Sequence, residues 1–128
     1  MERTLRLLLE AAHVEGEARA PGAFVRSARV IRRAMEAAGQ LTPEANRWLE
    51  DEADETDAEA ARFYDVLVRL ICGPGFEPLV EGQGNFGFLC YGHPDHPPAH
   101  PRYTECRITE RARQYLEDVG GSAAVPPA

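Results

Sequence analysis

The sequence predicts a single α+β domain, and three features of its 128 residues lead to this prediction. Apolar residues recur at helical spacing in several segments whose opposite faces are charged. A glycine-rich turn at 82–87 lies between short apolar runs, which is typical of a β-hairpin over about 77–90. Between 102 and 108, Tyr103, Glu105 and Arg107 then alternate with Thr104, Cys106 and Ile108, as on the two sides of a strand. We expect the domain to span 1–119 and a disordered tail to follow at 120–128.

The first two helices are expected near 2–12 and 24–38, with a loop at 16–22 where two glycines and a proline interrupt the pattern. Their apolar faces include Leu8, Leu9, Ala12, Phe24, Ile31 and Met35. The opposite face of the second helix carries Arg26, Arg29 and Arg33. This arginine face is either a solvated surface or a contact surface for DNA phosphates.

A short inserted helix is expected to begin at Pro43, because Thr42 is a good N-cap and proline suits the first helical position, and Leu41, Ala45, Trp48 and Leu49 form its apolar stripe. It runs into an acidic block at 50–59. The segment 44–65 contains two arginines and nine acidic residues, so it accounts for the whole net charge of −7. The acidic block is a solvated insertion, a segment that moves aside for DNA or a partner, or a sign that DNA binding has been lost.

A third long helix is expected over about 57–71, with Ala60, Tyr64 and Leu67 on its apolar face. A strand is expected at 103–108, and it would bury Cys106 and Ile108. Thr109 would then cap a last helix at 110–118.

Histidines gather in the predicted loop 91–101, at positions 93, 96 and 100, with Cys90 before the loop and Cys106 after it. Imidazole and thiolate groups are zinc ligands, but the spacing matches no standard zinc pattern. We therefore predict that the chain binds no metal, and leave a site at His93, His96 and His100 as the alternative.

No apolar run is long enough to cross a membrane, and the odd number of cysteines favours reduced thiols in a cytoplasm.

Two motifs, LVEGQGNFG at 79–87 and RYTE at 102–105, occur in this order on either side of a short loop. Together they resemble the A subunit of bacterial DNA gyrase and topoisomerase IV, the type IIA DNA topoisomerases. In that family a similar glycine-rich segment precedes an RYTE motif that carries the DNA-cleaving tyrosine. The order and the spacing make the resemblance specific. It extends less densely over roughly 24–118.

The resemblance implies a winged-helix domain, which is a helix-turn-helix with a β-hairpin wing, here with an inserted acidic helix. It implies that Tyr103 is the nucleophile that forms a 5′-phosphotyrosine link to DNA, and that Arg102 clamps the phosphate. Its candidate DNA-binding residues are Arg26, Arg29, Arg33, Gln83 and Asn85.

The chain also departs from the family. Two histidines that assist cleavage in the family fall at Thr56 and Ala58 here. The family's Mg²⁺ is held by a different domain, so the resemblance implies that the partner is a metal-binding topoisomerase subunit and that this chain has no cofactor. The family's two-fold DNA gate implies a homodimer, to which the inserted helix around Trp48 would add an apolar contact.

Two function classes follow. The first is a stand-alone DNA-cleavage module that acts on double-stranded DNA with a metal-bearing partner and is inactive alone. The second is a non-catalytic relative that acts as a regulator by binding DNA or a topoisomerase subunit.

Overall fold

The computed structural model describes residues 2–20, 22–72, 78–83 and 100–124. Its elements, in chain order, are α1 (Glu2–Arg19), β1 (Val25–Arg26), α2 (Ser27–Ala37), α3 (Pro43–Leu49), α4 (Ala58–Cys72), β2 (Val80–Gln83), the 3₁₀ helix η1 (Pro101–Tyr103), β3 (Glu105–Ile108) and α6 (Glu110–Ala124). Helices and a small antiparallel sheet occur together, so the predicted α+β class is confirmed.

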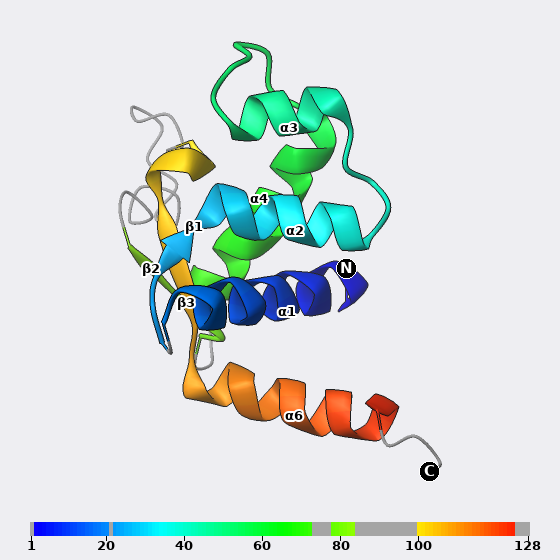
Figure 1. Cartoon of the computed structure of the whole chain (residues 1–128), viewed down its shortest axis with the longest axis vertical. Coiled ribbons are helices and arrows are strands. Elements are labelled where there is room, and N and C mark those ends of the chain that lie inside the picture. The colour runs from blue at the N-terminus through cyan, green and yellow to red at the C-terminus, as the bar shows by residue number, and fades with distance from the viewer. Residues whose placement is uncertain (1, 21, 73–77, 84–99, 125–128) are drawn as a thin grey trace.

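The sheet lies at one side of a stack of helices (Figure 1). Its strand order is β1-β3-β2, and β3 pairs antiparallel with both neighbours. Helices α1, α2 and α4 pack beside the sheet, α3 lies at the far end next to α2 and α4, and α6 leaves β3 beneath α1. The strand that comes last in the sequence is therefore the central one.

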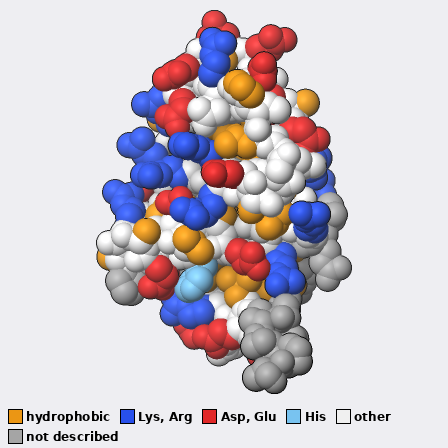
Figure 2. Space-filling view, turned by 45° about the vertical axis from the view of Figure 1, so that its right-hand side comes forward, with side chains coloured by type: hydrophobic (Ala, Val, Ile, Leu, Met, Phe, Trp, Pro, Cys, Tyr) orange, Lys and Arg blue, Asp and Glu red, His pale blue; other side chains and the backbone are white. Residues whose placement is uncertain are grey.

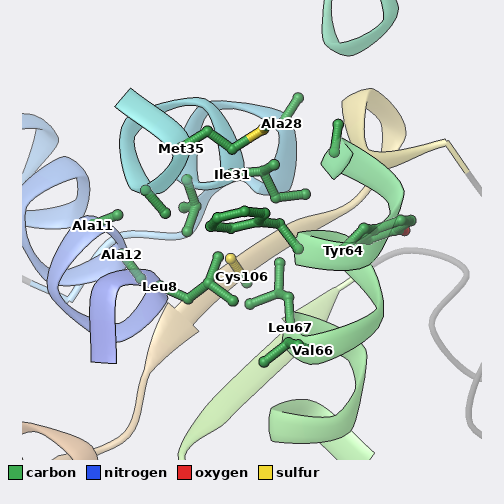
Figure 3. Close-up of a cluster of buried hydrophobic side chains, with 14 of the residues drawn as sticks. Leu8, Ala11, Ala12, Ala28, Ile31, Met35, Tyr64, Val66, Leu67 and Cys106 are labelled. Atoms are coloured by element: carbon green, nitrogen blue, oxygen red, sulfur yellow. The ribbon is translucent and has the colours of Figure 1, made fainter. Parts of the chain in front are cut away.

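The core fills the space between α1, α2, α4 and β3 (Figure 3). Leu8, Ile31 and Leu67 are fully buried, as the helical periodicity predicts. Phe63 is also fully buried, although it lies next to the predicted apolar stripe of α4 rather than on it. Residues at i and i+1 can both be buried in this way when a helix packs on two sides.

Helices α3, α4 and α6 begin at capping side chains. Thr42 Oγ1 accepts a hydrogen bond from the Ala45 amide over 3.0 Å, and Thr109 Oγ1 accepts one from the Ala112 amide over 3.2 Å, so both predicted caps are confirmed. Asp57 caps α4 in the same way, at 3.0 Å from the Ala60 amide.

Two predicted helix boundaries near the N-terminus are wrong. Helix α1 does not end before Gly16 but continues to Arg19, because one glycine costs a helix only about 1 kcal/mol and the neighbouring residues favour helix. Helix α2 begins at Ser27 rather than at residue 24, because Val25 and Arg26 pair with β3. Phe24 consequently lies before the strand, where its ring packs against the Arg107 guanidinium.

Two predicted boundaries near the C-terminus are also wrong. Arg102 and Tyr103 lie in η1, and the strand begins only at Glu105, because the chain turns at the buried Pro101 before it joins the sheet. Helix α6 continues past residue 118 to Ala124, into the segment predicted as a tail.

The first strand of the predicted hairpin is present as β2, and its partner in the sheet is β3. Residues 84–90, which would form the second strand of that hairpin, lie outside the described residues. Within the described ranges, no helix combines the length and the apolar character that crossing a membrane needs.

Candidate functional site

The candidate site is the turn that carries Arg102 and Tyr103, and its flanking residues fix it to the core. Thr104 is fully buried, and its hydroxyl donates a hydrogen bond to Ser27 Oγ over 2.8 Å. The Ser27 amide donates in return to the Thr104 carbonyl over 2.9 Å, and the Tyr64 hydroxyl lies 3.3 Å from Thr104 Oγ1. This buried network joins the start of α2, the middle of α4 and the end of η1, so the turn has a defined position.

His100 supports the turn from the other side. Its Nδ1 accepts a hydrogen bond from the Arg102 amide over 3.0 Å, so Nε2 carries the proton and donates to the Trp48 carbonyl over 2.7 Å. The imidazole and indole rings meet edge to face, with centroids 4.9 Å apart. Both ring nitrogens of His100 are therefore used within the protein.

The other residues of the zinc alternative, Cys90, His93 and His96, lie outside the described residues. Cys106 is buried in the core, and this burial raises the pKa of its thiol to about 12. In the described part of the chain, no group of three or more His, Cys, Asp or Glu side chains could hold a metal ion.

Tyr103 presents its ring to solvent, with 66% of the residue exposed. Its hydroxyl donates a hydrogen bond of 2.7 Å to Asp51 Oδ2, so the first half of the acidic block reaches the predicted nucleophile. This hydrogen bond and the negative charge of Asp51 raise the pKa of the Tyr103 hydroxyl, whereas the neighbouring Arg102 acts in the opposite direction.

Arg102 contacts the same segment, because its Nη1 donates a hydrogen bond to the Glu50 carbonyl. The Glu50 carboxylate in turn lies 3.8 Å from the guanidinium of Arg32 on α2. Glu50 therefore lies between two arginines and links the tyrosine turn to the basic face of α2.

That basic face is partly neutralised from α1. Glu15 lies 2.9 Å from Arg33 and 3.9 Å from Arg29, and its side chain is only 15% exposed. These residues line an open hollow of about 460 Å³ together with Arg32, Glu36 and Ala37. Figure 2 shows arginine side chains gathered on one face of the molecule with acidic side chains among them. Three arginines of α2 thus lie close together, as a phosphate-binding surface requires.

The remaining predicted DNA contacts lie on the sheet. Arg26 of β1 and Gln83 of β2 are both exposed, and both lie opposite Glu105 of β3. The three residues form one row across the sheet, and Glu105 follows Tyr103 by two positions. Asn85 lies outside the described residues.

Sequence reasoning missed three residues of this arrangement. Arg32 was detectable, since it lies on the helix surface beside Arg29 and Arg33. Glu50 and Asp51 were not, because each meets a partner 52 positions away in the sequence. Trp48 itself is only 8% exposed and packs within the protein, and the apolar dimer contact expected from the helix around it stays a prediction.

Part of the chain is similar to the A subunit of DNA gyrase. A stretch of 60 residues, 46% of this chain, is 47% identical to that protein from Thermotoga maritima and 43% identical to the one from Mycobacterium bovis. Over 58 residues the identity to the corresponding protein from Chlamydia pneumoniae is 44%. The match covers only 6% to 7% of the length of these relatives. No family model and no solved structure matches the chain.

Proposed function

We propose that this chain is a double-stranded-DNA-binding module of the kind found in the A subunits of type IIA topoisomerases, with a winged-helix arrangement and Tyr103 as a potential nucleophile. The observation that carries the proposal is the exposed pair Arg102 and Tyr103 on a turn whose neighbours, Pro101 and Thr104, are buried. The partial similarity to the A subunit of DNA gyrase supports it. Reactive groups need this combination of accessibility and fixed position.

The DNA would contact the basic face of α2. Arg29, Arg32 and Arg33 line one hollow, and Arg32 is linked through Glu50 to Arg102. Guanidinium groups suit phosphate oxygens in charge and shape, and such contacts position a protein on DNA without reading its sequence. Arg26 and Gln83 would extend this surface along the sheet, and Asn85 remains a proposed contact beyond the described residues.

The chemistry would be a transesterification. The Tyr103 oxygen attacks a backbone phosphorus, an O–P bond forms, and the P–O3′ bond breaks. The tyrosine proton leaves, and the released 3′ oxygen takes up a proton. Arg102 would hold and neutralise the phosphate. In the present arrangement Asp51 raises the pKa of the hydroxyl, so the nucleophile is not activated.

The Mg²⁺ that the resemblance implies does not fit the described residues, which offer no cluster of three candidate ligands. We propose that a metal-binding topoisomerase subunit supplies it and that this chain binds no cofactor of its own. We also propose a homodimer related by a two-fold axis, as the resemblance to the DNA gate implies.

Two gel experiments test the proposal. A gel shift with a short duplex at several salt concentrations should show salt-dependent binding. A denaturing gel should show no covalent protein–DNA adduct with the pure protein and Mg²⁺, but a Tyr103-dependent adduct when a metal-binding topoisomerase subunit is added. An adduct that persists in Tyr103→Phe would exclude Tyr103 as the nucleophile, and absence of DNA binding at low salt would exclude the module altogether.

The second candidate is a non-catalytic relative that acts as a regulator by binding DNA or a topoisomerase subunit. The contact between Tyr103 and Asp51 favours it, because the hydrogen bond and the negative charge of Asp51 raise the pKa of the Tyr103 hydroxyl and so disfavour the nucleophilic phenolate. Thr56 and Ala58 at the positions of the family's histidines favour it too. Salt-dependent DNA binding without an adduct under any of the conditions above would support this candidate over the first.

A further inference from the structure

The end of α3 lies along the tyrosine turn in a constant register. Trp48 meets His100, Glu50 meets Arg102, and Asp51 meets Tyr103, and each pair is separated by 52 positions in the sequence. Two segments that are remote in the chain therefore run side by side. All three contacts are hydrogen bonds from the turn to oxygen acceptors of residues 48–51, which we call the α3 end.

These contacts use the groups that a phosphate would need. The Arg102 guanidinium and the Tyr103 hydroxyl are the donors that would contact a DNA phosphate. Here they donate hydrogen bonds to the Glu50 carbonyl and the Asp51 carboxylate. A carboxylate resembles a phosphate in charge and in its oxygen acceptors. A phosphate brought to the same donors would also be repelled by the charge of Asp51.

The backbone at Asp51 is held in a demanding conformation. Its φ is +61°, and it is the only non-glycine residue with positive φ among the described residues. It follows α3 at the position where helices usually have glycine, and the Asp51 and Glu52 amides bond back to Trp48 and Arg47. An aspartate tolerates this conformation better than most residues, but glycine would suit it best. Helix termination alone therefore does not explain an acidic residue here.

We propose that Glu50 and Asp51, at the α3 end, are an internal competitor for the DNA phosphate: they occupy hydrogen-bonding groups of Arg102 and Tyr103 and must be displaced before a phosphate can bind there. This inference rests on the proposed DNA-binding function and describes the regulation of the same site. Arg32 holds the competitor from its other side through Glu50. Because Glu50, Asp51 and Tyr103 are exposed, the displacement is confined to residues 50–51 and leaves the buried Trp48 in the core.

The first test compares DNA binding by Asp51→Asn with wild type, using fluorescence anisotropy of a labelled duplex at low salt. Asparagine keeps the shape and tolerates positive φ, so the fold is retained while the charge is removed. Asp54→Asn is the matched control, since it removes the same charge from an exposed residue of the acidic block. We expect Asp51→Asn to bind at least about fivefold more tightly than Asp54→Asn, a gain typical of removing one charged interaction near the surface.

Asp51→Gly is a second variant, in which the residue adopts positive φ without strain and the side chain is removed. It should bind DNA as tightly as Asp51→Asn. Equal binding by the Asp51 and Asp54 variants would overturn the competitor, since net charge alone would then explain the gain. Failure of every variant to bind DNA at low salt would overturn the proposed function together with it.

A measurement without DNA tests the competitor independently of the proposed DNA-binding function. Carbon-13 NMR of labelled tyrosine can follow the titration of the Tyr103 phenol, which has Asp51, Arg102 and the His100 ring around it. Its pKa should fall in Asp51→Asn and stay as in wild type in Asp54→Asn. An unchanged pKa in Asp51→Asn would show that the contact is absent in solution, which contradicts the competitor regardless of DNA binding.

Discussion

Thr104 donates a hydrogen bond to Ser27 over 2.8 Å inside the core, although the two residues are 77 positions apart in the sequence. Both side chains are fully buried, and the Ser27 amide also donates a backbone hydrogen bond to the Thr104 carbonyl. This pair attaches the first turn of α2 to the residue that directly follows Tyr103. The positions of the basic helix and of the tyrosine are therefore set by one buried contact.

Replacing Thr104 with valine should destabilise the protein by about 1–3 kcal/mol, because the Ser27 and Tyr64 hydroxyls lose a buried partner while the volume is kept. Urea unfolding followed by circular dichroism measures the change. The control Thr56→Val alters an exposed threonine and should stay within about 0.5 kcal/mol of wild type. Equal stability of the two variants would show that the buried network contributes nothing.

Removing the Thr42 cap should loosen α3 in particular. Thr42→Ala takes away the acceptor of the Ala45 amide, at a cost of about 1 kcal/mol. Because this cap belongs to α3 alone, amide hydrogen exchange in 43–49 should accelerate more than exchange in α2 or α4. Uniform acceleration across all three helices would mean that α3 unfolds only together with the core.

DNA affinity should depend on salt through the arginines of α2. Removing one phosphate-binding arginine lowers the slope of log K against log salt by about 0.9, so Arg29→Ala and Arg33→Ala should each show a slope smaller by about that amount. Arg69→Ala is the control, because Arg69 lies on α4 and pairs with Asp65. A slope that changes equally in all three variants would point to net charge rather than to a binding face.

Stability should fall in alkaline solution. Burial raises the pKa of Cys106 from 9.0 to about 12 and that of Tyr64 from 10.0 to about 12. A raised pKa in the folded state means that the unfolded chain releases its protons first, so the contribution of both groups is present below their ordinary values and is lost as the pH rises from about 9 toward 12.

Urea unfolding at about pH 8 and about pH 11 measures this decline. The decline between the two conditions should be smaller in Cys106→Ala, whatever the absolute stability of that variant, because one of the two groups no longer titrates. An unchanged decline would exclude Cys106 as a source of the pH dependence.

Local signals in the sequence predicted the helices well. Periodicity predicted Leu8, Ile31 and Leu67 in the core, and Thr42 and Thr109 as caps, because both features depend on neighbours within one or two turns. The end of α1 was harder, since Gly16 weakens a helix without ending it.

The arrangement of the site was not predictable by the same reasoning. Alternation over 102–108 indicated a strand, but Pro101 is buried and the chain turns through η1 before it enters β3. The contact of Asp51 with Tyr103 depends on how an inserted helix docks, which no local pattern encodes. The resemblance pointed to Tyr103, but its densest motifs lie at 79–87 and 102–105 and carry no information on how residues 50–51 dock.

The position of β3 in the sheet also governs how the molecule is made. Its neighbours β1 and β2 are synthesised earlier, and their partner among the described strands is missing until residues 105–108 have left the ribosome. Helices α1, α2 and α4 can associate on the nascent chain before then, because their contacts lie within the first 72 residues. During that interval the hydroxyls of Ser27 and Tyr64 cannot yet form their contacts with Thr104. The turn with Tyr103 therefore acquires its shape late in synthesis, onto a helical scaffold that is already assembled.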